Sequence, residues 1–600
     1  MNKITKLLSL LTLTALLGLP SLAAAEAQAT AVRSQVIGES LSLAYAEEKG
    51  EAQSVMVYIE DIDQESARSR VSTSEPTALT LSNIPEEYPN QHEIEAKQAE
   101  IMALRNASKE AYLKQNTAFA EKYLDGKVEY ISKYSPVIIA SLDSADANRL
   151  ALNSGVESIE LYETDVVADI PEEESLAAPL ATTAGTDYLS MIQANEVHDA
   201  GYTGQGIKIG IQEIELPFND WLDRLGIPDG NCYSYEGHNS YVNYANADHA
   251  TYVTAVAVSV APDAEFFCAY LDPGFVQSTE WLLDQGVNVI NMSQALYTVV
   301  EGEGYLLNTY DVVAAWFDHI ALQHLVHVCL PSSNIIEQSP AGHICSALLS
   351  YNAISVGAVD SEGNITSYSN YSPMTLSEGS RPDICAPGSQ ILPHEDLDVP
   401  KGGTSFAAPV VAGAVALMCE QKPELLLYSE TVKSILAASV SDCYGKYNTS
   451  LVSNGNGFTQ YGAGIINCLN ASQAIEAIQC IYGEYFEPLT NGQIKVYTID
   501  LQAGKTTRIA LSYLRQAYYN HSSDINNYWN NTTSTTAPSV GFYVQRNGVY
   551  YAQTPSNYAG NLKIIEFVPS YTGTYTIMVN NNRGINETVW FSVAWYQYDT

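Results

Sequence analysis

Ser405 stands at the start of an apolar segment, where its hydroxyl group could serve as a nucleophile. The stretch GGTSFAAPVVAGAVALM, residues 402–418, is apolar or small on every face and predicts a buried helix. Pro409 is tolerated near the first turn of that helix, and the backbone N–H groups at its N-terminus point outward. The hydroxyl of Ser405 could therefore lie beside donors that stabilise negative charge, or it could simply cap the helix.

Glu213 ends a segment that is otherwise typical of a buried strand. In GIKIGIQEIEL, residues 206–216, three isoleucines alternate with small or polar residues, as in an extended chain. Either the strand surfaces here and the charge is solvated, or the carboxylate is buried and needs a partner. The segment alone leaves both interpretations open.

The segment around Ser405 resembles the nucleophile motif of the subtilisin-like serine proteases, Gly-Thr-Ser-x-Ala-Ala-Pro followed by an apolar helix. Every specified residue of that motif is present in residues 403–409. The stretch DHATYVTAVAVSVAPDAEFFCA, residues 248–269, resembles the family's histidine motif. The resemblance therefore implies that Ser405 is the nucleophile and His249 the general base.

Two further segments resemble landmarks of this family. LVHVCLPSSN ends at Asn334, in the place of the asparagine that stabilises the oxyanion together with the backbone N–H of the nucleophile. GVNVINMS, residues 286–293, resembles the strand that lines the substrate channel. The resemblance implies that the residues at its end bind substrate, namely Ser293, Gln294 and Ala295.

The acid of the triad is the main departure from the family. Its motif is an apolar strand that ends in Asp after a Gly-x-Gly turn, and GYTGQGIKIGIQE has Glu213 at this position. The resemblance thus implies a triad of Glu213, His249 and Ser405, in which the carboxylate holds the tautomer of the histidine. Three other carboxylates remain alternatives for this role: Glu215, Asp220 and Asp248.

The remaining departures do not remove a group that the reaction requires. Ala250 replaces the glycine after the histidine, Ser333 replaces the glycine before the asparagine, and the channel strand continues as Ser-Gln-Ala instead of Ser-x-Gly-Gly. The resemblance implies a serine endopeptidase that needs no cofactor. Structural calcium is common in the family, but no metal-binding residue can be assigned here. The alternative is an inactive protein that keeps the fold and binds through its C-terminal domain.

The rest of the chain predicts an α/β protein of several domains. Residues 50–165 predict a small split βαβ domain, which resembles the propeptide that assists folding and inhibits these proteases. The Pro-, Ala- and Thr-rich residues 166–186 predict a linker that is cut during maturation. Residues 187–480 alternate apolar strands with helices, typical of a parallel sheet, and carry the family resemblance. Short alternating strands in residues 481–600 predict a β-sandwich.

The N-terminal segment and the charge predict an exported protein with protein or peptide substrates. Residues 1–29 combine two lysines, a short apolar run and small residues, typical of a secretory signal peptide, and no later segment predicts a membrane span. The formal net charge of -40 argues against nucleic acid as a partner. Nine cysteines leave at least one unpaired within the chain, and the sequence does not assign any disulfide.

Overall fold

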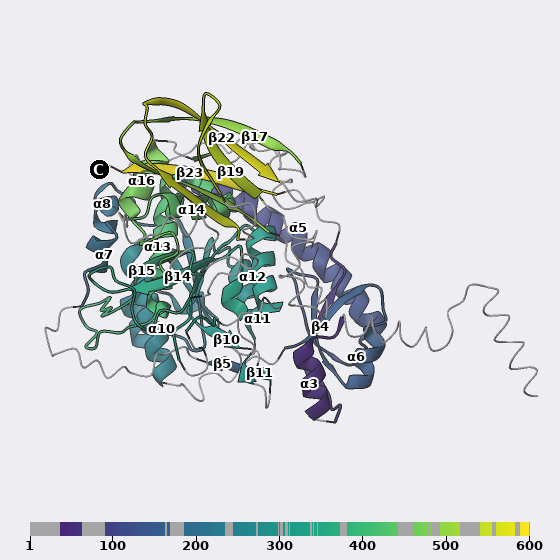
Figure 1. Cartoon of the computed structure of the whole chain (residues 1–600). Helices are drawn as coiled ribbons and strands as arrows, with labels where there is room; N and C mark the ends of the chain where they lie inside the picture. Colours follow the sequence, from purple (N-terminus) through teal and green to yellow (C-terminus); the bar gives the residue numbers. More distant parts are fainter. Residues whose placement is uncertain are drawn as a thin grey trace, which may run out of the picture.

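The computed structural model describes most of the chain between residues 36 and 598 (Figure 1). The predicted signal peptide and most of the predicted linker lie outside the described residues. The described ranges are 36–62, 90–167, 185–233, 244–371, 381–441, 460–515 and 540–598, except for short gaps at residues 48, 163–164, 272–273, 298, 301–303, 306–309, 311, 337–338, 340, 345, 478–479, 482–491, 555–559 and 582–588.

The first domain is a small α+β unit around an antiparallel sheet with the order β2-β3-β1-β4. The long helix α5 (Gln91–Tyr123) connects this unit to the rest of the protein: Ala120 packs in the core of the small domain, whereas Ile94 and Ile101 belong to the core of the central domain. The other elements are α3 (Glu39–Glu47), β1 (Gln53–Ile59), β2 (Val128–Ile131), β3 (Val137–Leu142), α6 (Ser144–Leu150) and β4 (Val156–Leu161).

The central domain is built on a seven-stranded parallel sheet with the order β15-β14-β13-β9-β6-β8-β7. The predicted α/β fold is therefore confirmed. The chain enters at β6, continues to one side, and returns to β9 beside β6, so the carboxyl end of β6 lies where the strand order reverses. Ligands bind at such switch points in α/β sheets. The strands are β6 (Lys208–Glu213), β7 (Cys232–Tyr233), β8 (Glu265–Tyr270), β9 (Val289–Met292), β13 (His327–Pro331), β14 (Ile354–Val359) and β15 (Ile384–Pro387).

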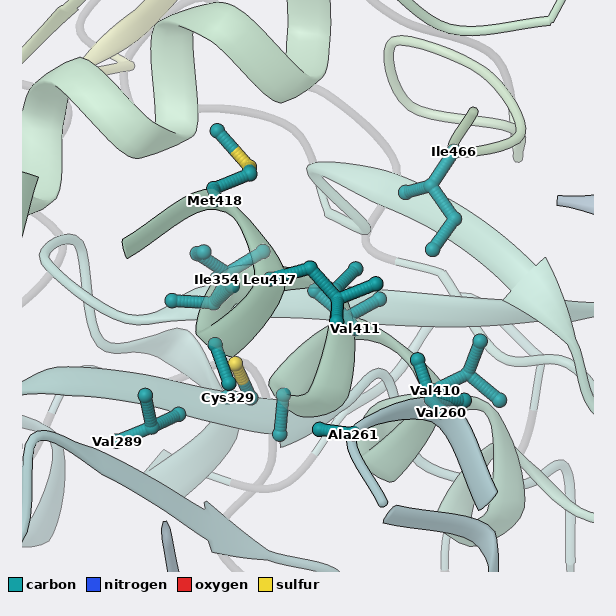
Figure 2. Close-up of a cluster of buried hydrophobic side chains, with 14 of the residues drawn as sticks. Val260, Ala261, Val289, Cys329, Ile354, Val410, Val411, Leu417, Met418 and Ile466 are labelled. Carbon is teal, nitrogen blue, oxygen red and sulfur yellow. The ribbon is translucent and has the colours of Figure 1, made fainter. Parts of the chain in front are cut away.

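The helix α13 (Thr404–Gln421) is buried along its whole length, as its uniformly apolar sequence predicts. Figure 2 shows its side chains Val410 and Val411 among residues of the sheet and of the end of α10 (Tyr244–Val260). By length and composition α13 alone among the described helices could cross a membrane, but here it is the core helix of the domain. This packing fixes the N-terminus of α13, where Ser405 lies.

The other helices of the central domain cover the two faces of the sheet or border it. Figure 1 shows α11 and α12 together, away from α10 and α13, and their apolar residues form a second core with the opposite face of the sheet. These helices are α7 (Tyr188–Met191), α8 (Ala194–Asp199), α9 (Asn219–Arg224), α11 (Phe275–Asp284), α12 (Val312–Gln323), α14 (Ser429–Ala438) and α16 (Cys468–Glu476), with short 3-10 turns at Asp229–Asn231, Ser346–Leu349 and Pro423–Leu427.

The C-terminal part folds as two antiparallel four-stranded sheets that face each other across an apolar core, which confirms the predicted β-sandwich. One sheet, β16-β23-β18-β21, rests on α14, where Ser434 and Ser592 share a hydrogen bond. The strands are β16 (Cys480–Ile481), β17 (Ile494–Leu501), β18 (Thr506–Tyr513), β19 (Val540–Arg546), β20 (Val549–Gln553), β21 (Leu562–Phe567), β22 (Gly573–Asn581) and β23 (Phe591–Tyr598).

Candidate active site

Glu213 is buried at the carboxyl end of β6 and is hydrogen-bonded to His249. Its exposed fraction is 2%, and its Oε2 atom lies 3.0 Å from Nδ1 of His249. Pairing of β6 with β8 and β9 on its two sides holds the backbone that carries this carboxylate. Of the alternative acids, Asp220 is exposed on α9 and Asp248 pairs with Lys401 at 2.8 Å.

His249 lies on α10, with its ring against the ring of Phe406 at a centroid distance of 5.2 Å. Its Nδ1 faces the carboxylate of Glu213, which leaves Nε2 for a second partner. Among the described residues, neither Nε2 of His249 nor Oγ of Ser405 has a hydrogen-bond partner, although both atoms are buried. A buried ring nitrogen and a buried hydroxyl without other partners are what a general base and its nucleophile require.

Ser405 is the second residue of α13 and is 1% exposed. Gly403 precedes the helix, and the hydroxyl of Ser405 has no hydrogen-bond partner among the described residues, so it does not serve as the cap. The backbone N–H groups of this first turn have no carbonyl of the helix as acceptor, which suits them to an anionic oxygen.

Asn334 follows β13 and reaches the same helix N-terminus. Its Oδ1 accepts hydrogen bonds from the backbone N of Thr404 at 3.0 Å and from its Oγ1 at 3.2 Å. Because these bonds hold the carbonyl side of the amide, the Nδ2 group is the side that can donate toward a substrate. A Cβ at Gly403 would lie 3.6 Å from this Nδ2, in ordinary van der Waals contact with it.

The three residues predicted to bind substrate have different environments. Ser293 donates to the backbone carbonyl of Ser405 at 2.8 Å and is fully buried. Ala295 begins β10 (Ala295–Tyr297), which pairs with the antiparallel strand β5 (Asp165–Val167) from beyond the small domain. The side chain of Gln294 is fully buried and donates to Oε2 of Glu213, a contact that the sequence does not predict.

The sequence gives only a weak indication of the contact between Gln294 and Glu213. Gln294 departs from the family's channel strand and Glu213 departs from its acid, but nothing in the linear order connects the two positions. The connection requires the sheet order, in which β9 and β6 are parallel neighbours and end at the same edge.

Comparison with known proteins gives matches to one family. The family model described as the subtilase family matches residues 272–464, which include Asn334 and Ser405 but begin after Glu213 and His249. Subtilisin E of Bacillus subtilis (strain 168) is 27% identical over 377 residues, covering 58% of this chain and 84% of that protein. An alkaline protease of Alkalihalobacillus alcalophilus is 26% identical over 289 residues, covering 46% of this chain and 70% of that protein.

A solved structure of fervidolysin from Fervidobacterium pennivorans, described as a keratinolytic enzyme related to subtilisin, covers 91% of this chain and 72% of its own. It has 16% sequence identity and a TM-score of 0.39. The range that the family model matches includes the motif around Ser405, and the two curated relatives are named as a protease and a subtilisin. Residues 272–464 thus match the subtilase family, and the chain is a serine endopeptidase of the subtilisin-like type.

Proposed function

We propose that this chain is the precursor of a secreted endopeptidase whose triad is Glu213, His249 and Ser405. The observation that carries the proposal is the 3.0 Å hydrogen bond between buried Glu213 and His249, at the sheet edge that α13 closes with Ser405. The signal-peptide pattern of residues 1–29 supports export.

The proposed reaction uses the side chains of the triad and the two oxyanion donors. Oγ of Ser405 attacks the carbonyl carbon of the peptide bond, and Nε2 of His249 takes the hydroxyl proton and then gives it to the leaving amine. Glu213 stabilises the imidazolium through Nδ1. Nδ2 of Asn334 and the backbone N–H of Ser405 donate to the oxyanion. Water then releases the acyl group from Ser405 by the same steps, and no cofactor takes part.

The small N-terminal domain acts as an inhibitory propeptide in this proposal. Its support is β5, which pairs in antiparallel fashion with β10: Val167 lies opposite Ala295, two residues beyond Ser293 and its contact with Ser405. A peptide strand on this edge runs toward the nucleophile, so β5 occupies the position that a substrate strand would take. Maturation within residues 165–186 would free this edge.

The contacts between the small domain and the central domain support a specific complex. Arg105 of α5 is 1% exposed and donates to the backbone carbonyls of His324 and Val287, each at 2.9 Å. The buried carboxylate of Glu280 accepts from the backbone N of Lys133 at 3.0 Å. Burying charged groups costs free energy unless they are paired. These two charges are paired only when the domains dock in this one arrangement, so the contacts favour a specific complex over a nonspecific one.

The test is covalent labelling of the processed protein with a fluorophosphonate probe. Wild type should label and Ser405→Ala should not, while Ser190→Ala, at an exposed serine of α7, should label like wild type. Ser405→Ala should also remain a longer chain on a denaturing gel if the protein processes itself. Equal labelling of wild type and Ser405→Ala would refute the enzyme and favour the binding-only alternative.

A further inference from the structure

Gln294 reaches the acid of the triad from a neighbouring strand. Because Gln212 pairs in register with Met292, Glu213 and Gln294 leave the sheet at the same edge. The Gln294 side chain is fully buried, its Nε2 donates to Oε2 of Glu213, and this Nε2 lies 3.3 Å from Nδ1 of His249.

One carboxylate oxygen of Glu213 thus faces two N–H groups, one from the imidazole of His249 and one from the amide of Gln294. An ionised carboxylate accepts several such bonds, and bonds to a charged acceptor are among the strong ones. Glutamate also has one more rotatable bond than aspartate, so its carboxylate needs more restraint to stay in one orientation.

We propose that Gln294 is a positioning residue that holds the carboxylate of Glu213 against His249. The inference rests on the proposed function, since it concerns the acid of that triad. Gln294 does not touch the reacting bond: it acts through Glu213, by fixing the orientation of Oε2 and by supporting its negative charge.

The other groups around the carboxylate do not supply this restraint. The thiol of Cys268 on β8 is within electrostatic reach of Glu213, but its pKa is raised well above the ordinary value by its hydrogen bond with Cys232 and by burial, so the thiol is neutral. Among the described residues, Oε1 of Glu213 has no hydrogen-bond partner. Oε2 is therefore the atom through which the described residues orient the carboxylate.

The experiment compares Gln294→Met with Gln212→Met in the processed enzyme. Gln212 is also fully buried at the end of β6, but its amide donates to α11, at 2.6 Å to Ser278 and 2.9 Å to Thr279. Both variants lose a buried amide, and only the first loses a contact with the triad. kcat and KM for a peptide substrate are measured from pH 5 to 9, and Tm is measured for each protein.

For Gln294→Met we expect kcat to fall about tenfold or more with KM within about twofold, because the lost bond involves a charged group. The acid limb of the kcat/KM profile should move to lower pH, because a carboxylate that is no longer held against Nδ1 of His249 stabilises the imidazolium less. Gln294→Glu should instead move this limb to higher pH, because its own carboxylate stabilises the imidazolium. Gln212→Met should lower Tm without moving the limb.

The inference is overturned if folded Gln294→Met keeps the wild-type kcat and acid limb, which would make the residue a packing element, or if only KM changes, which would make it a substrate contact. If Gln294→Met does not fold, kcat and the acid limb of Gln294→Asn, whose shorter side chain withdraws the amide from Oε2 of Glu213, decide in the same way. Fluorophosphonate labelling of wild type separates the two proposals: without labelling the proposed function fails, whereas labelling with an unchanged Gln294→Met profile removes only the role of Gln294.

Discussion

Shortening Glu213 to aspartate is the sharpest test of the proposed triad. The backbone at this position is held by β8 and the residue after it: Glu213 pairs with Tyr270, and its carbonyl accepts from the backbone N of Leu271 at 2.8 Å. Removing one methylene withdraws the carboxylate by about 1.5 Å, so the 3.0 Å contact with His249 would open to about 4.5 Å, beyond hydrogen-bond range. A bond to a charged group contributes about 1.5–3 kcal/mol, so kcat should fall roughly 10- to 150-fold.

The assay is turnover of a peptide substrate by processed enzyme, with Tm measured in parallel so that unfolding is not mistaken for a chemical defect. Glu215→Asp is the matched control, because it shortens another buried carboxylate of the same segment. Glu213→Gln keeps the length and removes the charge, and it should lose more activity because its amide can favour the wrong tautomer of His249. Glu213→Asp with turnover within twofold of wild type and an unchanged Tm would refute the argument from a fixed backbone, and well-folded Glu213→Gln with near-wild-type turnover would refute the assignment of the acid.

Three further predictions concern the oxyanion and the N-terminal domain. Asn334→Ala should lower kcat about a hundredfold or more with KM nearly unchanged, since an oxyanion donor acts in the transition state, and a variant with wild-type turnover would place the donor elsewhere. Arg105→Met should shorten the activation half-time of the full-length chain, because the carbonyls that follow α11 and α12 lose their buried donor; an unchanged half-time would argue against this contact. Mild acid should also speed activation. Burial lowers the pKa of His319 and, more strongly, of His324, so their contribution to the free energy of docking is fully present above about pH 6.5. It falls as the pH falls, by up to about 1.4 kcal/mol per pH unit for each histidine. Burial raises the pKa of Glu280, so uptake of one proton by this carboxylate favours docking in acid, whereas uptake of one proton by each of the two histidines disfavours it. Equal half-times at about pH 7.5 and 5.5 would contradict the prediction.

The fold could be predicted because its signals are local. The uniformly apolar segment after Ser405 can only be a core helix, and α13 is buried from end to end. The alternation of apolar strands and helices predicts a parallel sheet, whose carboxyl edge collects the side chains at the strand ends. Glu213 and His249 meet there at hydrogen-bond distance, although their roles stay predictions.

The contacts that the sequence could not predict join segments that are distant in the chain. Arg105 stands in the middle of a long amphipathic helix, where a cation is ordinarily solvated, yet it is buried against carbonyls more than 170 residues away. The pairing of β5 with β10 likewise joins the end of the N-terminal domain to the channel strand. Such contacts depend on how whole domains pack, and no local pattern encodes them.

The two departures from the family that looked unrelated in the sequence meet at one atom. Glutamate in place of aspartate brings a longer, less restrained carboxylate, and Gln294 in the channel strand brings an amide to Oε2 of that carboxylate. A buried carboxylate without donors would be destabilising, so the longer acid and the new donor form one arrangement rather than two losses. In the binding-only alternative the acid takes part in no reaction. The buried pair of His249 and Glu213 with its additional amide would then cost desolvation free energy and serve no catalytic function. The convergence at Oε2 therefore favours an active protease whose triad has shifted to glutamate together with its support.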